Sequence, residues 1–190
     1  MPVAIVTSRD ALVSEEKARC GLGLLVGKPH VCEVEAQTEH TIAHAKLDVG
    51  HLSWGRLAFR GSHVCNPMQQ KQGGPLLNPE LEWYYNGDVG WQDGAGNLYY
   101  MGRDADTVHF CTGVAVPAVA LESVILFDNR IQACALLPLQ NGEGLLLCEL
   151  AKGVKLAEVK GEATRLLSAS IWWDGIAGHL TIAQYCPQPE

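Results

Sequence analysis

The chain has 190 residues, of which 47% are hydrophobic and 18% charged, and its net charge is −7. This composition excludes a mainly disordered chain, and the excess of acidic over basic residues argues against nucleic acid as a partner. The first residues lack the basic and apolar parts of a signal peptide. No apolar run reaches the roughly 18 residues of a membrane-spanning helix. Seven widely spaced cysteines without a CxxC pair indicate reduced thiols. We therefore expect a cytoplasmic protein with no membrane partner.

Residues 1–102 carry mainly strand patterns. Short apolar or alternating segments, which are typical of half-buried strands, occur in chain order at residues 2–6, 31–36, 54–60, 89–92 and 97–101. Asp93-Gly94-Ala95-Gly96 lies between the last two and predicts a hairpin. The Gly- and Pro-rich residues 66–80 predict a long loop.

After Arg103 the patterns alternate between helix and strand. Residues 117–127 suit a short helix, and residues 155–167 have apolar side chains at helical spacing. Residues 131–137 and 144–150 read as strands around the turn Gln140-Asn141-Gly142, and residues 179–185 read as a last strand. The second half is therefore expected to be α+β.

One stretch, WYYNGDVGWQDGAGNLYYMGRDADTVHFCTG, has a more specific pattern. It resembles adenylate-forming enzymes, the acyl-CoA synthetases and the adenylation domains of nonribosomal peptide synthetases. Their Thr-Gly-Asp, Asp-Gly turn, aromatic strand and Gly-Arg-Asp correspond to Asn86-Gly87-Asp88, Asp93-Gly94, Tyr99-Tyr100 and Gly102-Arg103-Asp104. The match is most similar to the fungal synthetase-like and carboxylate-reductase variants, with Thr112, Gly113 and Glu122 in register.

The resemblance implies a mixed β and α+β fold. Residues 1–102 would form a small distorted β-barrel, and residues 103–190 a small, mobile α+β subdomain with Asp104 at its hinge. In this family Asp88 and Arg103 would contact the ribose hydroxyls of ATP. The chain is read as a truncated relative of the C-terminal portion of such enzymes.

Departures from the family pattern indicate that ATP chemistry is lost. The segments that hold the triphosphate, adenine and carboxylate have no counterpart in these residues. No lysine follows Lys160, where the family has its catalytic lysine. Asn86 replaces a threonine, and Val114-Ala115 replaces Glu-Lys. Two ribose ligands without a phosphate cradle cannot position ATP for attack. We therefore expect no ligase activity and no cofactor.

Two functions remain open. The first is a small biosynthetic enzyme that performs cyclase, isomerase or dehydratase chemistry on a small organic molecule by acid–base catalysis. Asp88 or His109 would move protons and Arg103 would hold an oxyanion. The ligand would contact Tyr85, Asn86, Trp91 and Tyr100. The competing interpretation of these residues is structural: a retained ion pair or turn for Asp88 and Arg103, and a packed core for the aromatic rings.

The second function is a non-catalytic module that binds a partner or completes a split adenylation enzyme. A homo-oligomer could then cover the surface left by the missing large subdomain.

Three His-x-Cys pairs, His30/Cys32, His63/Cys65 and His109/Cys111, could each present two ligands on one strand face. That spacing is not a strong metal motif, so no metal is predicted. The reactivity of Cys111 depends on its surroundings and stays open.

Overall fold

The computed structural model describes residues 4–5, 15–29, 33–43, 51–61 and 83–186. These residues form two compact units, of which the first contains residues 4–5 and the described part of 25–100. The second unit contains residues 15–24 and 101–186. The domain boundary expected between residues 102 and 103 stays a prediction.

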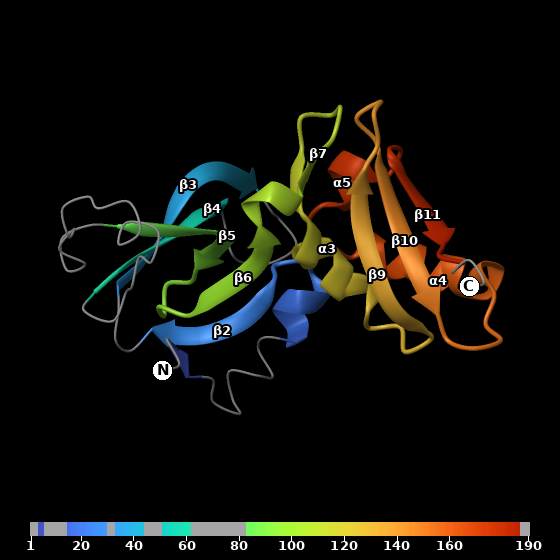
Figure 1. Cartoon of the computed structure of the whole chain (residues 1–190), viewed down its shortest axis with the longest axis horizontal. Helices are drawn as coiled ribbons and strands as arrows, with labels where there is room; N and C mark the ends of the chain where they lie inside the picture. The colour runs from blue at the N-terminus through green and yellow to red at the C-terminus, as the bar shows by residue number, and fades with distance from the viewer. Residues whose placement is uncertain (1–3, 6–14, 30–32, 44–50, 62–82, 187–190) are drawn as a thin grey trace, which may run out of the picture. The chain divides into compact units, whose positions relative to one another are not determined.

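A six-stranded sheet dominates the first half of the chain (Figure 1), and its strand order is β1-β2-β6-β5-β4-β3. Its strands are β1 (Ala4–Ile5), β2 (Leu24–Pro29), β3 (Glu33–Ala43), β4 (His51–Arg60), β5 (Tyr84–Gln92) and β6 (Leu98–Arg103). The sheet curls into a half-barrel, so the predicted mixed fold with a distorted β-barrel is confirmed. The buried side chains of this sheet include Trp54, Leu57 and Tyr99, each 2% exposed or less. The loop expected at 66–80 lies outside the described residues.

The hairpin between β5 and β6 is confirmed, and Asp93 explains it. Oδ1 of Asp93 accepts hydrogen bonds from the backbone N–H groups of Ala95, at 3.0 Å, and Asn97, at 2.9 Å. Gly96 has φ +84°, a left-handed conformation that favours glycine. The side chain of Asp93 and this glycine together reverse the chain.

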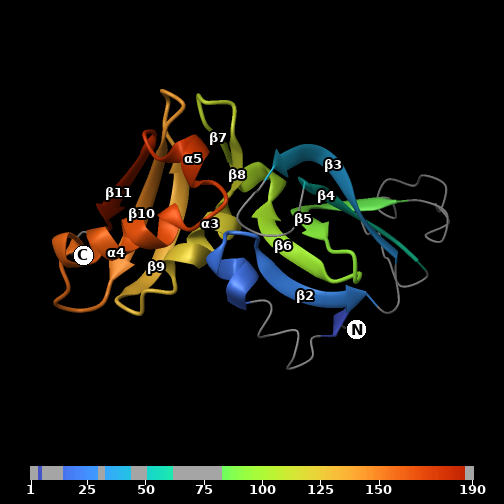
Figure 2. The same ribbon diagram turned by 180° about the vertical axis from the view of Figure 1, so that it is seen from behind.

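The second unit combines a three-stranded sheet with helices. Its elements are a 3₁₀ turn (Asp104–Asp106), β7 (Thr107–His109), β8 (Ala115–Pro117), α3 (Ala118–Ile125), β9 (Ile131–Pro138), β10 (Gly144–Leu150), α4 (Leu156–Ser168), α5 (Trp173–Ile176) and β11 (Leu180–Gln184). The sheet order is β11-β10-β9, in which β9 is antiparallel and β11 parallel to β10. Figures 1 and 2 show α4 and α5 on one face of this sheet. The helices and strands expected after residue 103 are therefore confirmed.

Helix α4 follows from its apolar spacing. Val159, Ala163, Leu166 and Leu167 recur every three or four residues and are all buried. The backbone N–H of Lys155 donates to the carboxylate of Glu158, at 3.3 Å, which caps the start of the helix.

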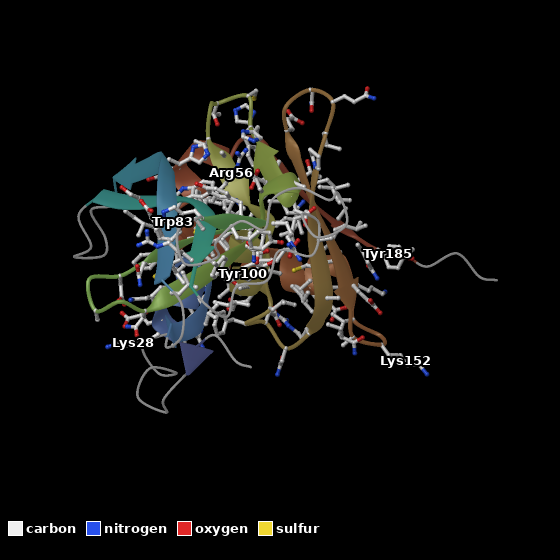
Figure 3. All side chains as sticks on the ribbon, turned by 60° about the vertical axis from the view of Figure 1, so that its left-hand side comes forward. Lys28, Arg56, Trp83, Tyr100, Lys152 and Tyr185 are labelled. Atoms are coloured by element: carbon white, nitrogen blue, oxygen red, sulfur yellow. The ribbon has the colours of Figure 1, made fainter. Side chains whose placement is uncertain are left out.

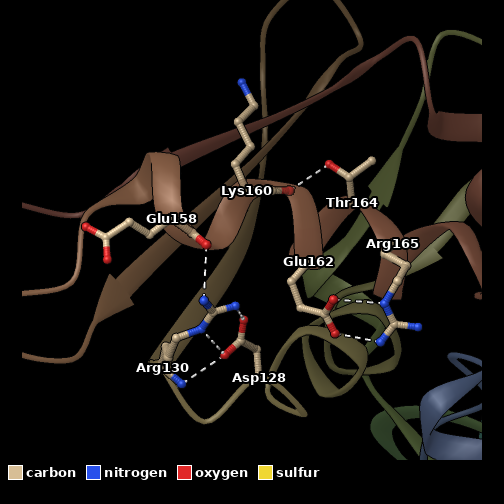
Figure 4. Close-up of polar contacts among 7 residues, drawn as sticks. All are labelled: Asp128, Arg130, Glu158, Lys160, Glu162, Thr164 and Arg165. Atoms are coloured by element: carbon tan, nitrogen blue, oxygen red, sulfur yellow. Dashed lines mark hydrogen bonds and ion pairs between the residues drawn. The ribbon is translucent and has the colours of Figure 1, made fainter.

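An ion pair ties the start of β9 to this helix (Figure 4). The Asp128 carboxylate accepts from the backbone N–H, Nε and Nη2 of Arg130, at 3.0, 2.9 and 2.7 Å. Nη1 of Arg130 donates to the backbone carbonyl of Glu158, at 3.1 Å. This carboxylate–guanidinium pair thus joins two segments that are distant in sequence.

A segment from early in the chain belongs to the second unit. Residues 15–19 are helical, and Leu22 is 1% exposed. The backbone carbonyl of Cys20 accepts from the N–H of Ile171, at 3.0 Å, and that of Gly21 accepts from Nε1 of Trp172, at 2.7 Å. A Cβ atom at Gly21, whose φ is +74°, would lie 2.8 Å from Cδ1 of Trp172. Glycine is therefore required both by the backbone conformation and by the close approach of the tryptophan ring.

Candidate functional site

The Asn86-Gly87-Asp88 motif forms a bulge in strand β5. Arg56 of β4 pairs with Val89 and Ala58 pairs with Tyr85, so a single residue of β4 faces residues 86–88. Gly87 has φ +83°, which explains why glycine stands at this position. Bulges of this kind redirect side chains and are frequent beside active sites.

Inside the bulge, Asn86 fixes Asp88. Nδ2 of Asn86 donates to Oδ2 of Asp88, and Oδ1 of Asn86 accepts the backbone N–H of Asp88 at 3.0 Å. Both residues are half-buried. The carboxylate is therefore held in one orientation at a position that retains contact with solvent.

The aromatic residues around this hairpin divide into two groups. Trp91 is 3% exposed and stacks on Tyr99, with ring centroids 4.5 Å apart. The hydroxyl of Tyr99 donates to Oδ2 of Asp93, at 3.1 Å. By contrast, Tyr85 is 42% exposed and Tyr100, labelled in Figure 3, is half-buried. Trp91 thus packs in the core, whereas Tyr85 and Tyr100 have surface that a ligand can reach.

Arg103 and His109 belong to the second unit. Arg103 is the last residue of β6 and is exposed, and its carbonyl accepts from the hydroxyl of Thr107 at 3.4 Å. His109 ends β7 and is also exposed. Asp88 lies in the other unit, so a site shared by these three residues stays a prediction.

Two positions that depart from the family pattern, Val114 and Ala115, contribute to packing in the second unit. Ala115 is buried, and a Cβ atom at Gly175 would lie 2.5 Å from Cγ2 of Val114. The two residues that replace Glu-Lys thus contribute apolar contact rather than charge.

Glu122, which the resemblance aligns with a family glutamate, has a structural contact. Its Oε1 accepts the backbone N–H of Leu136 in β9, at 2.9 Å. Burial raises the pKa of Glu122, and the charge of Asp106 adds to this increase, while the bond from Leu136 opposes it. Since β9 is an edge strand, this bond occupies a donor that would otherwise be open to strand pairing.

The second unit also contains a contact between a thiol and an imidazole that was not predicted from the sequence. Sγ of Cys111 is 3.4 Å from Nδ1 of His179, and the two residues are 68 positions apart. Cys111 is exposed and His179 is half-buried. No local motif connects them, so sequence reasoning could name Cys111 but not its partner.

Three other thiols of the second unit are more buried than that of Cys111. Burial raises the pKa of Cys134 to about 12 and that of Cys148 to about 11. Burial also raises the pKa of Cys20, and nearby Glu16 adds to the effect. Cys186 is exposed. The five described cysteines are all free thiols.

Two further properties of the described residues concern metal binding and membrane insertion. Within the described ranges, no three His, Cys, Asp or Glu side chains cluster closely enough to hold a metal ion. Two of the three His-x-Cys pairs lie outside those ranges. Among the helices described, none is long and apolar enough to span a membrane.

No protein-family model and no curated protein matches this sequence, but solved structures do. The amide bond synthetase McbA from Marinactinospora thermotolerans matches with a TM-score of 0.62 and 17% identity, over 99% of this chain and 36% of that one. The o-succinylbenzoate CoA synthetase MenE from Bacillus subtilis, in complex with its acyl-adenylate, gives a TM-score of 0.60 and 17% identity, over 99% and 36%.

The anthranilate CoA ligase AuaEII, in complex with anthranoyl-AMP, has a TM-score of 0.55 and 18% identity, over 87% of this chain and 32% of that one. The chain therefore has the fold of the C-terminal portion of adenylate-forming ligases, and the expected resemblance is confirmed at the level of fold. It spans about a third of the length of the solved structures that it matches.

Proposed function

We propose that this chain is a small nucleotide-independent enzyme that performs acid–base chemistry on an organic molecule. The observation that supports this proposal best is the bulge at residues 86–88. It keeps a hydrogen-bonded carboxylate at a half-buried position, although Asn86 has replaced the threonine of the family pattern. A base in a fixed orientation is what proton transfer requires.

In the proposed mechanism, Asp88 removes a proton from a carbon next to a carbonyl group. The oxyanion that forms needs a stabilising donor, and the sequence predicts Arg103 for that role and His109 for the return of the proton. Tyr85 and Tyr100 contact the organic skeleton. Return of the proton gives isomerisation, whereas loss of a leaving group gives dehydration and attack within the molecule gives cyclisation.

The proposal excludes ligase activity by this chain. The amide of Asn86 is engaged with Asp88, and apolar Val114 and Ala115 replace two charged residues of the family pattern. We also propose the cytoplasm as its location, because the described cysteines are free thiols.

Titration calorimetry with AMP and ATP tests the loss of nucleotide chemistry. It is combined with an assay for pyrophosphate release from ATP in the presence of benzoate or anthranilate. We expect neither micromolar binding nor release. Pyrophosphate release that Asp88→Ala abolishes would overturn the proposal. Micromolar AMP binding without release would point instead to a split adenylation module.

Proton exchange tests the proposed acid–base chemistry, with Asp88 as the base. The full chain is incubated in D₂O with acetoacetyl-N-acetylcysteamine, whose acidic C–H exchange is followed by NMR. We expect exchange faster than in buffer and reduced by roughly 10²-fold or more in Asp88→Asn. An exposed carboxylate of the second unit provides the control variant, Asp174→Asn. Equal rates for the wild type and both variants would count against Asp88 as the base.

A second candidate function, a partner-binding module, is favoured by an apolar surface in the second unit. The outer sheet face is the side of the β9–β11 sheet opposite α4 and α5. Paired positions place on it Ala133, Ala135, Leu137, Leu145, Leu147, Glu149, Thr181 and Ala183. Leu137 is 41% exposed, and Tyr185 beyond β11 is 47% exposed and points away from the ribbon (Figure 3).

We propose a second copy of the chain as the occupant of this face. The chain carries a net charge of −7, yet Glu149 is the one charged residue among the described members of the outer sheet face. Two copies can therefore meet there with little repulsion between like charges. Apolar contact would then remove Leu137 and its neighbours from water.

Sedimentation velocity at several concentrations tests this second candidate. We expect a dimer for the wild type and a monomer for Leu137→Glu. Leu126→Glu is the matched control, because Leu126 is 45% exposed but lies at the end of α3. A monomeric wild type would overturn the second copy as occupant and leave the face to a different partner.

A further inference from the structure

Cys111 and His179 are brought together by three loops of the second unit. Cys111 lies in the turn between β7 and β8, and His179 directly precedes β11. The third loop joins β9 to β10 and passes beside both residues. Their side chains meet with Sγ of Cys111 3.4 Å from Nδ1 of His179.

Backbone hydrogen bonds fix the position of Cys111. Its N–H donates to the carbonyl of Gly142, at 2.7 Å. The turn is closed by the N–H of Gly113, which donates to the carbonyl of Phe110 at 2.9 Å. The hydroxyl of Thr112 donates to the carbonyl of Gly175, at 2.8 Å. The loop that carries the thiol is therefore held from two sides.

His179 is fixed in the same way. Its N–H donates to the carbonyl of Ile176, at 2.8 Å, and its carbonyl accepts the N–H of Gly144, at 2.8 Å. Since both backbones are fixed, the fold keeps the thiol and the imidazole within reach of each other. Such preorganisation is what a nucleophile and its base require.

We propose that Cys111 is a nucleophile activated by His179, and that it accepts acyl groups from thioesters. Nδ1 of His179, in the tautomer that carries its proton on Nε2, takes the proton of Sγ. The sulfur then attacks the carbonyl carbon of the thioester, and a new carbon–sulfur bond forms. The bond to the departing sulfur breaks, and the imidazolium gives its proton to the thiolate that leaves. The products are S-acyl-Cys111 and a free thiol.

Thioesters fit this pair for two reasons. A thiolate exchanges with a thioester carbonyl without a cofactor or oxidant, because one carbon–sulfur bond replaces another. Cys111 is also exposed. A thiol at the surface of a turn can be reached by an acyl group that is attached to a bulky carrier.

The chain provides internal controls for selectivity. Cys186 is exposed like Cys111, but within the described residues no histidine forms a hydrogen bond with its thiol. Cys134 and Cys148 have pKa values raised by burial to about 12 and about 11, and so carry very little thiolate at neutral pH. Selective acylation would therefore identify the effect of His179. The inference does not depend on either function proposed above.

The test uses the full chain and S-benzoyl-N-acetylcysteamine at neutral pH. Intact-protein mass spectrometry follows the gain of one benzoyl group, and peptide mapping assigns it to a cysteine. We expect Cys111 to be acylated about 100-fold faster than Cys186. The variant Cys111→Ser should lose this fast acylation, and Cys186→Ser should keep it.

The role of His179 is tested by His179→Ala, with folding checked by circular dichroism. Acylation of Cys111 should fall by roughly 100-fold, and added imidazole should restore part of the rate. A purely structural role would not give this rescue. Equal acylation of Cys111 and Cys186 in the wild type would overturn the proposal even if the variant failed to fold. Absence of acylation, or a folded His179→Ala with an unchanged rate, would also overturn it.

Discussion

Replacing Asp128 by asparagine tests whether the ion pair at the start of β9 stabilises the second unit. The Asp128 side chain is 4% exposed and that of Arg130 is 39% exposed. Asparagine keeps Oδ1, which accepts from the backbone N–H and Nε of Arg130. It replaces Oδ2, the acceptor of Nη2, with an amide that donates. The variant therefore loses one charge-assisted bond and the charge itself.

The expected loss follows from these contacts. A hydrogen bond to a charged group contributes about 1.5–3 kcal/mol, and removal of one partner of a fully buried ion pair costs about 3–5 kcal/mol. Arg130 can be hydrated in the variant because more than a third of its side chain is exposed. We therefore expect the free energy of unfolding to fall by about 2 kcal/mol.

Urea titration followed by circular dichroism and by tryptophan fluorescence measures this change. The two probes should give coincident transitions if the unfolding is two-state. The control is Glu162→Gln, which removes the charge that pairs with exposed Arg165 on α4 (Figure 4) and should cost much less stability, because that pair is screened by solvent. A loss in Asp128→Asn no larger than in this control would refute the reasoning.

The same variant should change the pH dependence of stability. Hydrogen bonding to Arg130 holds the pKa of Asp128 below its ordinary value. The contribution of Asp128 is therefore fully present above the unfolded-state pKa of about 3.9, and it is lost as the pH falls through the lower folded-state pKa. The stability difference between wild type and Asp128→Asn should shrink as acid titrates this carboxylate. A difference that stays constant from pH 7 to pH 2 would contradict this assignment.

Two further substitutions probe single contacts. Gly21→Ala should destabilise the chain more than Gly153→Ala. Both glycines have positive φ, which costs roughly 1–2 kcal/mol for alanine. At Gly21 the new Cβ also meets Trp172, whereas at Gly153 it meets nothing within 4 Å. Equal losses of unfolding free energy would show that this contact is not close. Glu122→Gln should keep the hydrogen bond from the Leu136 N–H. Because the pKa of Glu122 is raised in the folded chain, the contribution of its carboxyl group to stability is lost as the pH rises, so the variant should be neutral or stabilising at pH 8. Alanine should instead cost about 1–3 kcal/mol, since it leaves a buried donor without an acceptor, and thermal unfolding at pH 8 compares the two variants.

Local chemistry made much of the fold predictable from the sequence. The side chain of Asp93 and the glycine at 96 determine the β5–β6 hairpin within a few residues. Helix α4 follows in the same way from apolar side chains at helical spacing. Such elements require no knowledge of distant parts of the chain.

Features that depend on distant residues were not predictable. The bulge at residues 86–88 is defined by its register against β4. The motif contains Gly87, but a glycine alone does not determine that register. The contact of Cys111 with His179 spans 68 positions, and that of Gly21 with Trp172 spans 151. Each depends on a tertiary arrangement that leaves no periodic pattern in the sequence.

The second unit is discontinuous along the sequence, and this sets an order of events during synthesis. Residues 15–24 leave the ribosome first, but their carbonyl groups at Cys20 and Gly21 meet donors only after Ile171 and Trp172 have been made. Closing a loop of this length is entropically costly and slow. These two carbonyl groups therefore wait for their donors while the intervening strands are synthesised. Capture of the early segment by the Trp172 ring is then a late step of folding, which any amino-terminal truncation past residue 21 would abolish.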